Sequence, residues 1–271
     1  MVALPFLFMG STVEKPAAQP KWEQLFNGKN IKDWQVKIRK HDLNDNYGNT
    51  FRVNDGMIQV RYDKYPDFDE QYGHLFYKKT YSHYLIGVEY RFVGDQVKGG
   101  PGWAFRNSGI MIHGQLPAAM SKDQDFPNSI EVQLLGGSGN GKRTTANICT
   151  PGTQFVKNGK VIKTHCVESN SKTFDGDQWV RAEVLVLGDS LVVHYINGEE
   201  VLRYESPQKD PVKGSDIGEL LKSGSISLQS ESHPVDFRKV EIINLEKYAK
   251  DPSKLRKMIE TITSEKRIAK Q

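Results

Sequence analysis

The sequence predicts an all-β fold, a sandwich or jelly roll, and three observations support this. Between about Trp22 and Leu245, short apolar segments with a period of two alternate with turn signals, as strands do in such folds. The composition agrees, because 24 glycines and 10% aromatic residues suit many short strands joined by tight turns. No useful length of this region has a helical period. We therefore expect one domain over residues 21–246.

The strands are expected in order along the chain, each bounded by turn residues. Asn54-Asp55-Gly56 and Asn197-Gly198 are typical of tight hairpin turns, and Gly188-Asp189-Ser190 marks a third turn. The expected strands are residues 51–60 as a hairpin, 75–77, 84–92, 107–113, 130–134, 179–187, 191–196, 201–204, 226–231 and 235–245.

Both ends of the chain differ from this body. Residues 1–20 begin with an apolar run that resembles part of a secretory signal without its charged start, and a disordered chain end is the alternative. The signal interpretation predicts a periplasmic or secreted protein. In the tail, residues 247–271, Asp251-Pro252 precedes apolar residues at helical spacing, which predicts a short amphipathic helix that either packs on the domain or extends into solvent. No stretch is long enough to span a membrane.

Charge and cysteine content narrow the function classes. The formal net charge is +4, and no basic stripe with interleaved aromatics runs through the body, so nucleic-acid binding is not expected. In an exported protein, Cys149 and Cys166 could form a disulfide worth about 3 kcal/mol. Two unrelated buried thiols are the alternative. A zinc site with His165 is disfavoured, because two Cys and one His do not make a zinc pattern.

Four predicted strands, within residues 86–92, 107–113, 130–134 and 226–231, put apolar residues on one side and polar residues on the other. If these strands share a sheet, its polar face is unusually rich in carboxylates and amides for a solvent face. We predict a binding or active site there, rimmed by irregular segments at 94–103 and 115–128. The polar residues of the four strands are Glu89, Arg91, Asn107, Met111, His113, Glu131, Gln133, Gln229 and Glu231.

Glu131 and Glu89 are the leading catalytic candidates, because paired carboxylates can serve as acid and base. The alternative is that both are solvated strand residues paired with arginines. His113 at a strand end and His233 just beyond another are candidates for acid–base chemistry. These four residues together could also hold a divalent metal ion through nitrogen and oxygen ligands.

Three other patterns are set aside. The glycine-rich run at 136–141 lacks the Lys-Ser/Thr pair and following helix of a phosphate-binding loop. Asn107-Ser108-Gly109 does not match the Gly-x-Ser-x-Gly pattern of a nucleophile elbow. His194 is expected on the surface, because its alternating neighbours Leu191, Val193 and Tyr195 look like core.

Several segments occur in a fixed order between residues 22 and 245: 25–34, 107–110, 131–133, 177–179, 197–198 and 228–238. This ordered set resembles the 3-keto-disaccharide (3-keto-glycoside) hydrolase family, and 144–152 and 165–166 look like a subgroup of exported bacterial proteins. The resemblance implies a concanavalin-A-like sandwich with a concave carbohydrate face, and action on glycosides oxidised at C3. Many family members have Arg where this chain has His113, so a metal or acid–base role transfers less well to that residue. The matching site positions are Asn107, Ser108, Glu131, Gln133, Gln229 and His233.

The implied chemistry suits these residue types, because a C3 ketone acidifies the proton on C2. We expect Glu131 to remove that proton and His113 or His233 to act as acid or metal ligand, with Glu89 and Arg91 holding the sugar or the enolate. β-Elimination followed by hydration would complete the cleavage. The expected substrate-binding residues are Arg91, Asn107, Ser108, Gln133, Gln229 and Glu231.

Two other functions fit the same fold. One is a non-catalytic carbohydrate-binding protein, and the other is an ordinary glycosidase that uses Glu89 and Glu131. A site rich in acids, bases and His favours chemistry over binding alone. The oligomeric state is not predicted.

Overall fold

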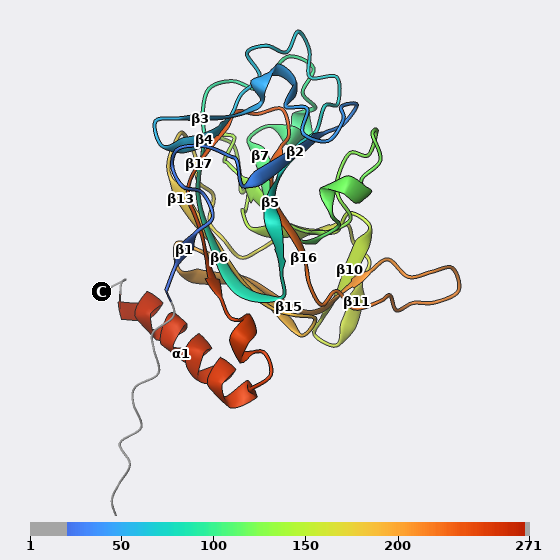
Figure 1. The fold of residues 1–271 in the computed structure, drawn as a ribbon, viewed down its shortest axis with the longest axis vertical. Coiled ribbons are helices and arrows are strands. Elements are labelled where there is room, and N and C mark those ends of the chain that lie inside the picture. The colour runs from blue at the N-terminus through green and yellow to red at the C-terminus, as the bar shows by residue number, and fades with distance from the viewer. Residues whose placement is uncertain (1–20, 269–271) are drawn as a thin grey trace, which may run out of the picture.

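The structure is a computed structural model that describes residues 21–268, so the signal-like segment 1–20 lies outside the described residues. Two antiparallel sheets pack face to face, which confirms the predicted β-sandwich (Figure 1). No helix of the described chain has the length and apolar character needed to cross a membrane. Short 3-10 turns interrupt the loops at η1 (Tyr47–Asn49), η2 (Gly102–Ala104), η3 (Pro117–Ala119) and η4 (Glu246–Tyr248).

The larger sheet has ten strands and contains the three predicted hairpin turns. Asp55 and Gly56 at one turn, and Asn197 and Gly198 at another, have positive φ, as tight hairpins require. In spatial order its strands are β11 (Lys160–Ile162), β10 (Thr153–Lys157), β15 (Glu199–Lys209), β14 (Leu191–Ile196), β13 (Val180–Leu187), β6 (His83–Phe92), β17 (Val235–Asn244), β4 (Met57–Val60) and β3 (Phe51–Asn54), with β1 (Glu23–Gln24) also paired to β17.

The smaller sheet has seven strands and carries three of the four polar segments. Its strands are, in spatial order, β12 (Cys166–Val167), β9 (Asn147–Cys149), β8 (Ile130–Leu135), β7 (Asn107–Gly114), β16 (Gly224–Ser230), β5 (Gly73–Tyr81) and β2 (Trp34–Ile38). Cys149 and Cys166 lie opposite each other on β9 and β12 and form a disulfide, which confirms that pairing. The bond joins the edge strand to the rest of this sheet.

The alternating apolar residues meet between the two sheets. Ile110, Val132 and Leu228 from the smaller sheet are completely buried, and so are Ile86 and Val88 from β6 of the larger sheet. Each such side chain stabilises the fold by about 1.5–3 kcal/mol relative to exposure to water. The polar sides of both sheets therefore face away from the core.

Residues 86–92 do not share a sheet with the other three polar segments, so that expectation is wrong. They belong to β6, which pairs with β13 and β17 of the larger sheet. Alternation along a strand shows which side chains share a face, but the choice of sheet depends on partners far away in the sequence.

The predicted tail helix is α1 (Pro252–Ile268), and it packs on the outer face of the larger sheet (Figure 1). Met258 and Ile262 are buried there against an apolar patch that includes Val193 and Tyr195. This cover reverses the expectation for His194. Its ring is completely buried on the core side, within 2.9 Å of the Ala146 carbonyl and 3.0 Å of the Tyr204 hydroxyl.

Candidate functional site

A buried cluster of polar side chains lies on the outer face of the smaller sheet. Strand register places Glu131 opposite Met111, and Met111 opposite Ser227. Gln229 lies opposite His74 on the next strand. These side chains alternate with the core residues, so they point away from the larger sheet. We call the following residues the polar cluster: His74, Asn107, Glu131, Gln133, Ser227, Gln229 and Glu231.

Most members of the polar cluster are buried without a hydrogen-bond partner. Glu131 is 6% exposed and Glu231 is 2% exposed, although both are carboxylic acids. Buried polar groups in proteins are nearly always hydrogen-bonded, so several unpartnered groups at one place indicate a site for a polar ligand. Within the described chain, the unpartnered buried atoms of the cluster are both ring nitrogens of His74, Asn107 Oδ1, Glu131 Oε1, Ser227 Oγ, both amide atoms of Gln229 and Glu231 Oε2.

Gly109 lets two of these side chains converge. A Cβ atom at this position would lie 3.0 Å from Glu131 Oε1 and 3.0 Å from Gln229 Oε1. That is closer than ordinary van der Waals contact, so a side chain at 109 would displace them. The hydrogen of Gly109 leaves the space in which a carboxylate and an amide face one another.

The two carboxyl groups of the cluster have perturbed acidity. Burial raises the pKa of Glu131 to about 8, because the charged form loses its hydration. Burial also raises the pKa of Glu231 well above its usual value, and the negative charge of Glu131 raises it further. Glu131 therefore loses its proton first, while Glu231 keeps its proton. Two carboxyl groups that differ in this way can serve as base and acid.

His74 and Lys37 extend the cluster across β5 and β2. Burial, together with the positive charge of nearby Lys37, lowers the pKa of His74 to about 3, so the ring is neutral at pH 7. Lys37 is itself 3% exposed, and its ammonium donates hydrogen bonds to the carbonyls of Ile38, His41 and Lys122. The bond to Lys122 is 3.0 Å long and ties the 115–128 segment to β2.

Aromatic side chains lie along one side of the cluster. The Tyr72 ring is 4.9 Å from Phe126 and 6.0 Å from Trp103, measured between ring centroids. Phe126 is also 6.0 Å from the His74 ring. Burial, helped by the charge of Glu231, raises the pKa of Tyr72 to about 12, so the phenol is neutral at pH 7. The two irregular segments predicted as a rim supply Trp103 and Phe126.

Gln133 and Ser108, both predicted to bind substrate, have different surroundings. Gln133 is partly exposed, and its Oε1 accepts a 3.1 Å hydrogen bond from Asn147 Nδ2. Ser108 alternates with Asn107 and Gly109, which puts its side chain on the core side of β7. Its hydroxyl donates a 2.8 Å hydrogen bond to the Gln229 carbonyl, so Ser108 supports the strand that carries Gln229 and does not face the cluster.

Glu89 and Arg91 are not part of this site. Both lie on the outer face of the larger sheet, where Glu89 pairs with Arg238 at 2.7 Å and Lys239 at 3.0 Å. Partial burial acts to raise the pKa of Glu89, but hydrogen bonds from these two cations hold it below its usual value. Arg91 pairs with Asp236 at 2.8 Å. The structure therefore does not bring these two predicted site residues to the polar cluster, and their ion pairs agree with the alternative that Glu89 is paired with arginine.

His113 is turned away from the cluster by a β-bulge. Ser225 pairs with Gly114 and Ser227 with Met111, so two residues of β7, Ile112 and His113, oppose one residue of β16. His113 has a φ of 51° and is 3% exposed. Burial lowers the pKa of His113 to about 4, so its ring is neutral at pH 7.

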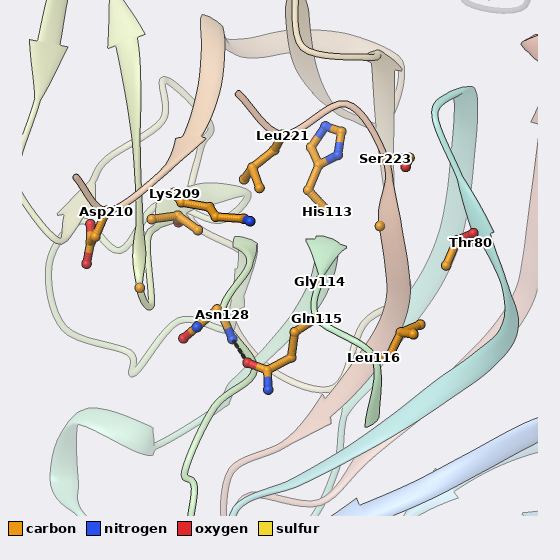
Figure 2. Close-up of a pocket in the computed structure, with 13 residues that line it drawn as sticks. Thr80, His113, Gly114, Gln115, Leu116, Asn128, Lys209, Asp210, Leu221 and Ser223 are labelled. Carbon is orange, nitrogen blue, oxygen red and sulfur yellow. Dashed lines mark hydrogen bonds between the residues drawn. The ribbon is translucent and has the colours of Figure 1, made fainter. Parts of the chain in front are cut away.

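The His113 side chain lines a pocket of about 760 Å³ at the end of β7, beside Leu221 and Ser223 (Figure 2). The alternation rule failed here, because the bulge inserts a residue that the sequence does not mark.

His233 also lies outside the cluster. Ser232 before it has a φ of 82°, which breaks the alternation that would place His233 beside Gln229 and Glu231. Its ring is completely buried between Phe92 and Phe105, with centroids 5.7 and 5.0 Å away. Burial lowers the pKa of His233 to about 4, and the charge of Arg106 lowers it further.

The proposed set of metal ligands does not fit the structure. Glu131 is on the smaller sheet, Glu89 is on the outer face of the larger one, and the two histidines lie beyond the bulge and the Ser232 turn. Among residues 21–268, no group of three or more His, Cys, Asp or Glu side chains is arranged to hold a metal ion. We therefore assign no step of the chemistry to a metal.

Sequence reasoning missed several residues that line the site, among them Lys37, Tyr72, His74 and Ser227. His74 alternates with buried Leu75 in the segment Gly73–Tyr81, so the same period of two could have found it. The sequence predicts a strand there only over residues 75–77, so His74 lies just before the predicted strand. Tyr72 precedes that strand, and no sequence signal links it to the site.

Comparison with known proteins agrees with this fold. The sequence matches the family described as the 3-keto-alpha-glucoside-1,2-lyase-like domain over residues 21–243. No curated protein matches the chain. A candidate glycosyl hydrolase from Parabacteroides distasonis is 20% identical, with a TM-score of 0.50 over 83% of this chain and 94% of its own.

A protein of unknown function with a galectin-like fold from Bacillus subtilis is 13% identical. Its TM-score is 0.52 over 83% of this chain and 94% of its own. At such low identity these structures support the sandwich fold and nothing further. The family match covers almost the whole described sandwich and agrees with the predicted resemblance. The chain therefore belongs to the 3-keto-alpha-glucoside-1,2-lyase-like domain family and is a carbohydrate-active protein.

Proposed function

We propose that this protein cleaves glycosides oxidised at C3 by β-elimination followed by hydration. The main support for this proposal is a pair of buried carboxyl groups, Glu131 and Glu231, which lie on one polar face without a cation partner. Glu131 loses its proton before Glu231, because the charge of Glu131 raises the pKa of Glu231. The reaction needs one group that takes a proton and one that gives a proton. The family match supports a sugar as the substrate.

Glu131 is the base in this proposal. Its carboxylate takes the proton from C2, and the C–H electrons move to form an enolate whose charge rests on the C3 oxygen. A base with a pKa near 8 is well matched to this task, because it is strong enough to take the proton and still partly ionised near neutral pH.

Glu231 is the acid. The enolate electrons form the C1–C2 double bond as the C1–O bond breaks, and the departing oxygen takes the Glu231 proton. Water then adds across the double bond. Glu231 takes one proton from the water as the hydroxyl bonds to C1, and Glu131 gives its proton to C2, which releases the 3-keto sugar. Both carboxyl groups thereby recover their starting states.

Amide and imidazole groups stabilise the enolate. Gln229 has an unpartnered amide nitrogen and converges on Glu131 over Gly109, so its N–H can donate to the C3 oxygen as its charge grows. His74 is neutral and also donates one N–H. These groups replace the Arg91, His113 and metal contacts expected from the sequence.

We also propose a periplasmic or secreted location. The Cys149–Cys166 disulfide supports it, because such bonds form and persist mainly in oxidising compartments. Cell fractionation of the source organism would test this, and recovery of the protein from the cytoplasm with free thiols would contradict it.

The activity is tested by incubating the protein with methyl 3-keto-glucoside and with unoxidised methyl glucoside. We expect release of methanol from the keto form alone, at the same rate with and without a chelator. Cleavage of the parent sugar would indicate an ordinary glycosidase, and binding without turnover would indicate a lectin. The glycosidase alternative that pairs Glu89 with Glu131 is already disfavoured, because these carboxylates lie on different sheets.

A further inference from the structure

Trp103 is an unusual surface residue. It is 55% exposed and is the one aromatic side chain among the large hydrophobic residues that the described chain exposes. Its ring is held near-parallel to that of Tyr72, with 20° between the planes and 6.0 Å between the centroids. Exposed aromatic surface beside a polar site is typical of a place where a ligand docks.

The backbone that carries Trp103 is fixed in place. The residue sits in η2, and Ala104 beside it is completely buried. Arg143 donates hydrogen bonds to the carbonyls of Trp103 at 3.4 Å and Arg106 at 3.3 Å, and another to Gly136. The ring is therefore presented by an anchored turn, and its exposure is not the result of a loose loop.

Trp103 lies on the side of the site where the acid is. Its ring stacks on Tyr72, which is 6% exposed. Phe105, two residues after Trp103, packs 5.0 Å from the ring of His233, which is two residues after Glu231. In the proposed reaction Glu231 protonates the departing oxygen, so the group attached to that oxygen leaves on this side.

We infer that Trp103 and Tyr72 form a subsite for the leaving group, and that this subsite takes a group with a flat apolar face. A second pyranose ring and an aromatic aglycone both have such a face, and both can stack on an indole ring. This inference rests on the proposed function, because it uses the direction in which the leaving group departs. It predicts a preference for large flat leaving groups over small ones.

The test compares kcat/KM for methyl, phenyl and glucosyl 3-keto-glucosides. In the Trp103→Ala variant we expect the phenyl-to-methyl and glucosyl-to-methyl ratios each to fall about tenfold, which is the size of an aromatic stacking contribution. Trp103→Phe should restore most of each ratio. A larger effect on the phenyl ratio would identify an aryl aglycone as the preferred group, and a larger effect on the glucosyl ratio would identify a sugar.

Leu116→Ala is the matched control, because Leu116 is 56% exposed on the other rim segment and is not aromatic. It should leave both ratios unchanged. Ratios that stay constant in Trp103→Ala, or that fall equally in Leu116→Ala, would overturn the subsite.

Failure of the proposed function gives a different result. In that case the wild-type protein would not turn over methyl 3-keto-glucoside at all. The subsite would then be judged by calorimetric binding of the phenyl and methyl compounds to the wild type and to Trp103→Ala. Tighter binding of the phenyl compound that is lost in the variant would support it, and equal binding would overturn it.

Discussion

The outer faces of both sheets carry carboxylic acids, but these acids have different partners on the two sheets. On the larger sheet three carboxylates each have a cation: Glu89 has Arg238, Asp236 has Arg91, and Glu241 has Arg181. On the smaller sheet Glu131 and Glu231 are buried with unpartnered oxygens. The cations lower the pKa of Glu89, whereas burial raises the pKa of Glu131 and of Glu231.

The lesson is that alternation along a strand does not identify a catalytic acid. Glu89 and Glu131 each interrupt an apolar strand, and each points away from the core. Their pKa values move in opposite directions. Hydrogen bonds from cations lower the pKa of Glu89, whereas Glu131 loses its hydration without gaining a cation, and this raises its pKa. The two glutamates therefore differ in their charged neighbours and not in their strand pattern.

The sharpest test of this comparison exchanges each carboxylate for its amide. Glu131→Gln should lower kcat on 3-keto-glucosides by about 10³-fold, in the range of lost general-base catalysis. Glu89→Gln, the matched control, should retain activity within about twofold and lose a little thermal stability, because it breaks ion pairs that are partly exposed. Steady-state kinetics and thermal melts on both variants would decide, and an inactive Glu89→Gln would reverse the assignment.

The second test separates acid from base. Glu231→Gln removes the proton donor, so we expect kcat to fall about 100-fold on methyl 3-keto-glucoside. The fall should be smaller on phenyl 3-keto-glucoside, because phenoxide leaves more easily without protonation. Equal losses on the two substrates would show that Glu231 does not protonate the leaving group.

The acidity of the smaller sheet also predicts a pH dependence. Because Glu131 must be ionised to act, kcat/KM should rise about tenfold per pH unit until the pKa of Glu131, about 8, is reached. At higher pH it should fall as Glu231 loses its proton. A pH profile that is flat from 5 to 8 would rule out Glu131 as a base in its buried state.

Gly109→Ala should disturb the smaller sheet alone. The added Cβ would press on Glu131 and Gln229, so we expect kcat to fall about tenfold with a loss of stability of about 1 kcal/mol. The readouts are kcat and a urea unfolding curve. Full activity in a folded Gly109→Ala protein would mean that the two side chains need not converge.

The smallest expected effect is on stability. The folded protein holds the Glu131 and Glu231 protons more tightly than the unfolded chain, so their contribution to stability is present at low pH and is lost as pH rises through the folded pKa. Glu131→Gln should therefore raise the melting temperature at pH 8 by roughly 3–6 °C relative to wild type, and less at pH 5. The same shift at both pH values would contradict this linkage.

Much of the fold could be predicted because its signals are local. The hairpin at Asn54–Gly56, the strands 130–135 and 235–244, and the tail helix each depend on neighbouring residues. The division of the strands into two sheets could not be predicted, because β6 pairs with β13 and β17, which lie about 100 or more residues further along the chain.

The site was predicted only in part for the same reason. Glu131 and Gln229 follow from alternation, and the structure brings them together over Gly109. Asn107 also follows from alternation and lies further along β7, opposite Leu135. Alternation placed His113 and His233 wrongly. A β-bulge changes the direction of the His113 side chain, and the positive φ of Ser232 changes that of His233. Which carboxylates have cation partners depends on residues such as Arg238, which is 149 positions from Glu89 in the sequence.

The disulfide has a consequence for how the protein matures. Cys149 lies opposite Glu131 on one side and opposite Cys166 on the other, so the bond fastens the edge strand directly beside the base. A freshly made chain with free thiols would hold this edge only by hydrogen bonds, those of the short β12 ladder and those from Thr150 and to Asn147 that flank it. We expect such a chain to be a poor catalyst until the disulfide forms. The protein would then become active in the compartment where its thiols are oxidised and not where the chain is synthesised.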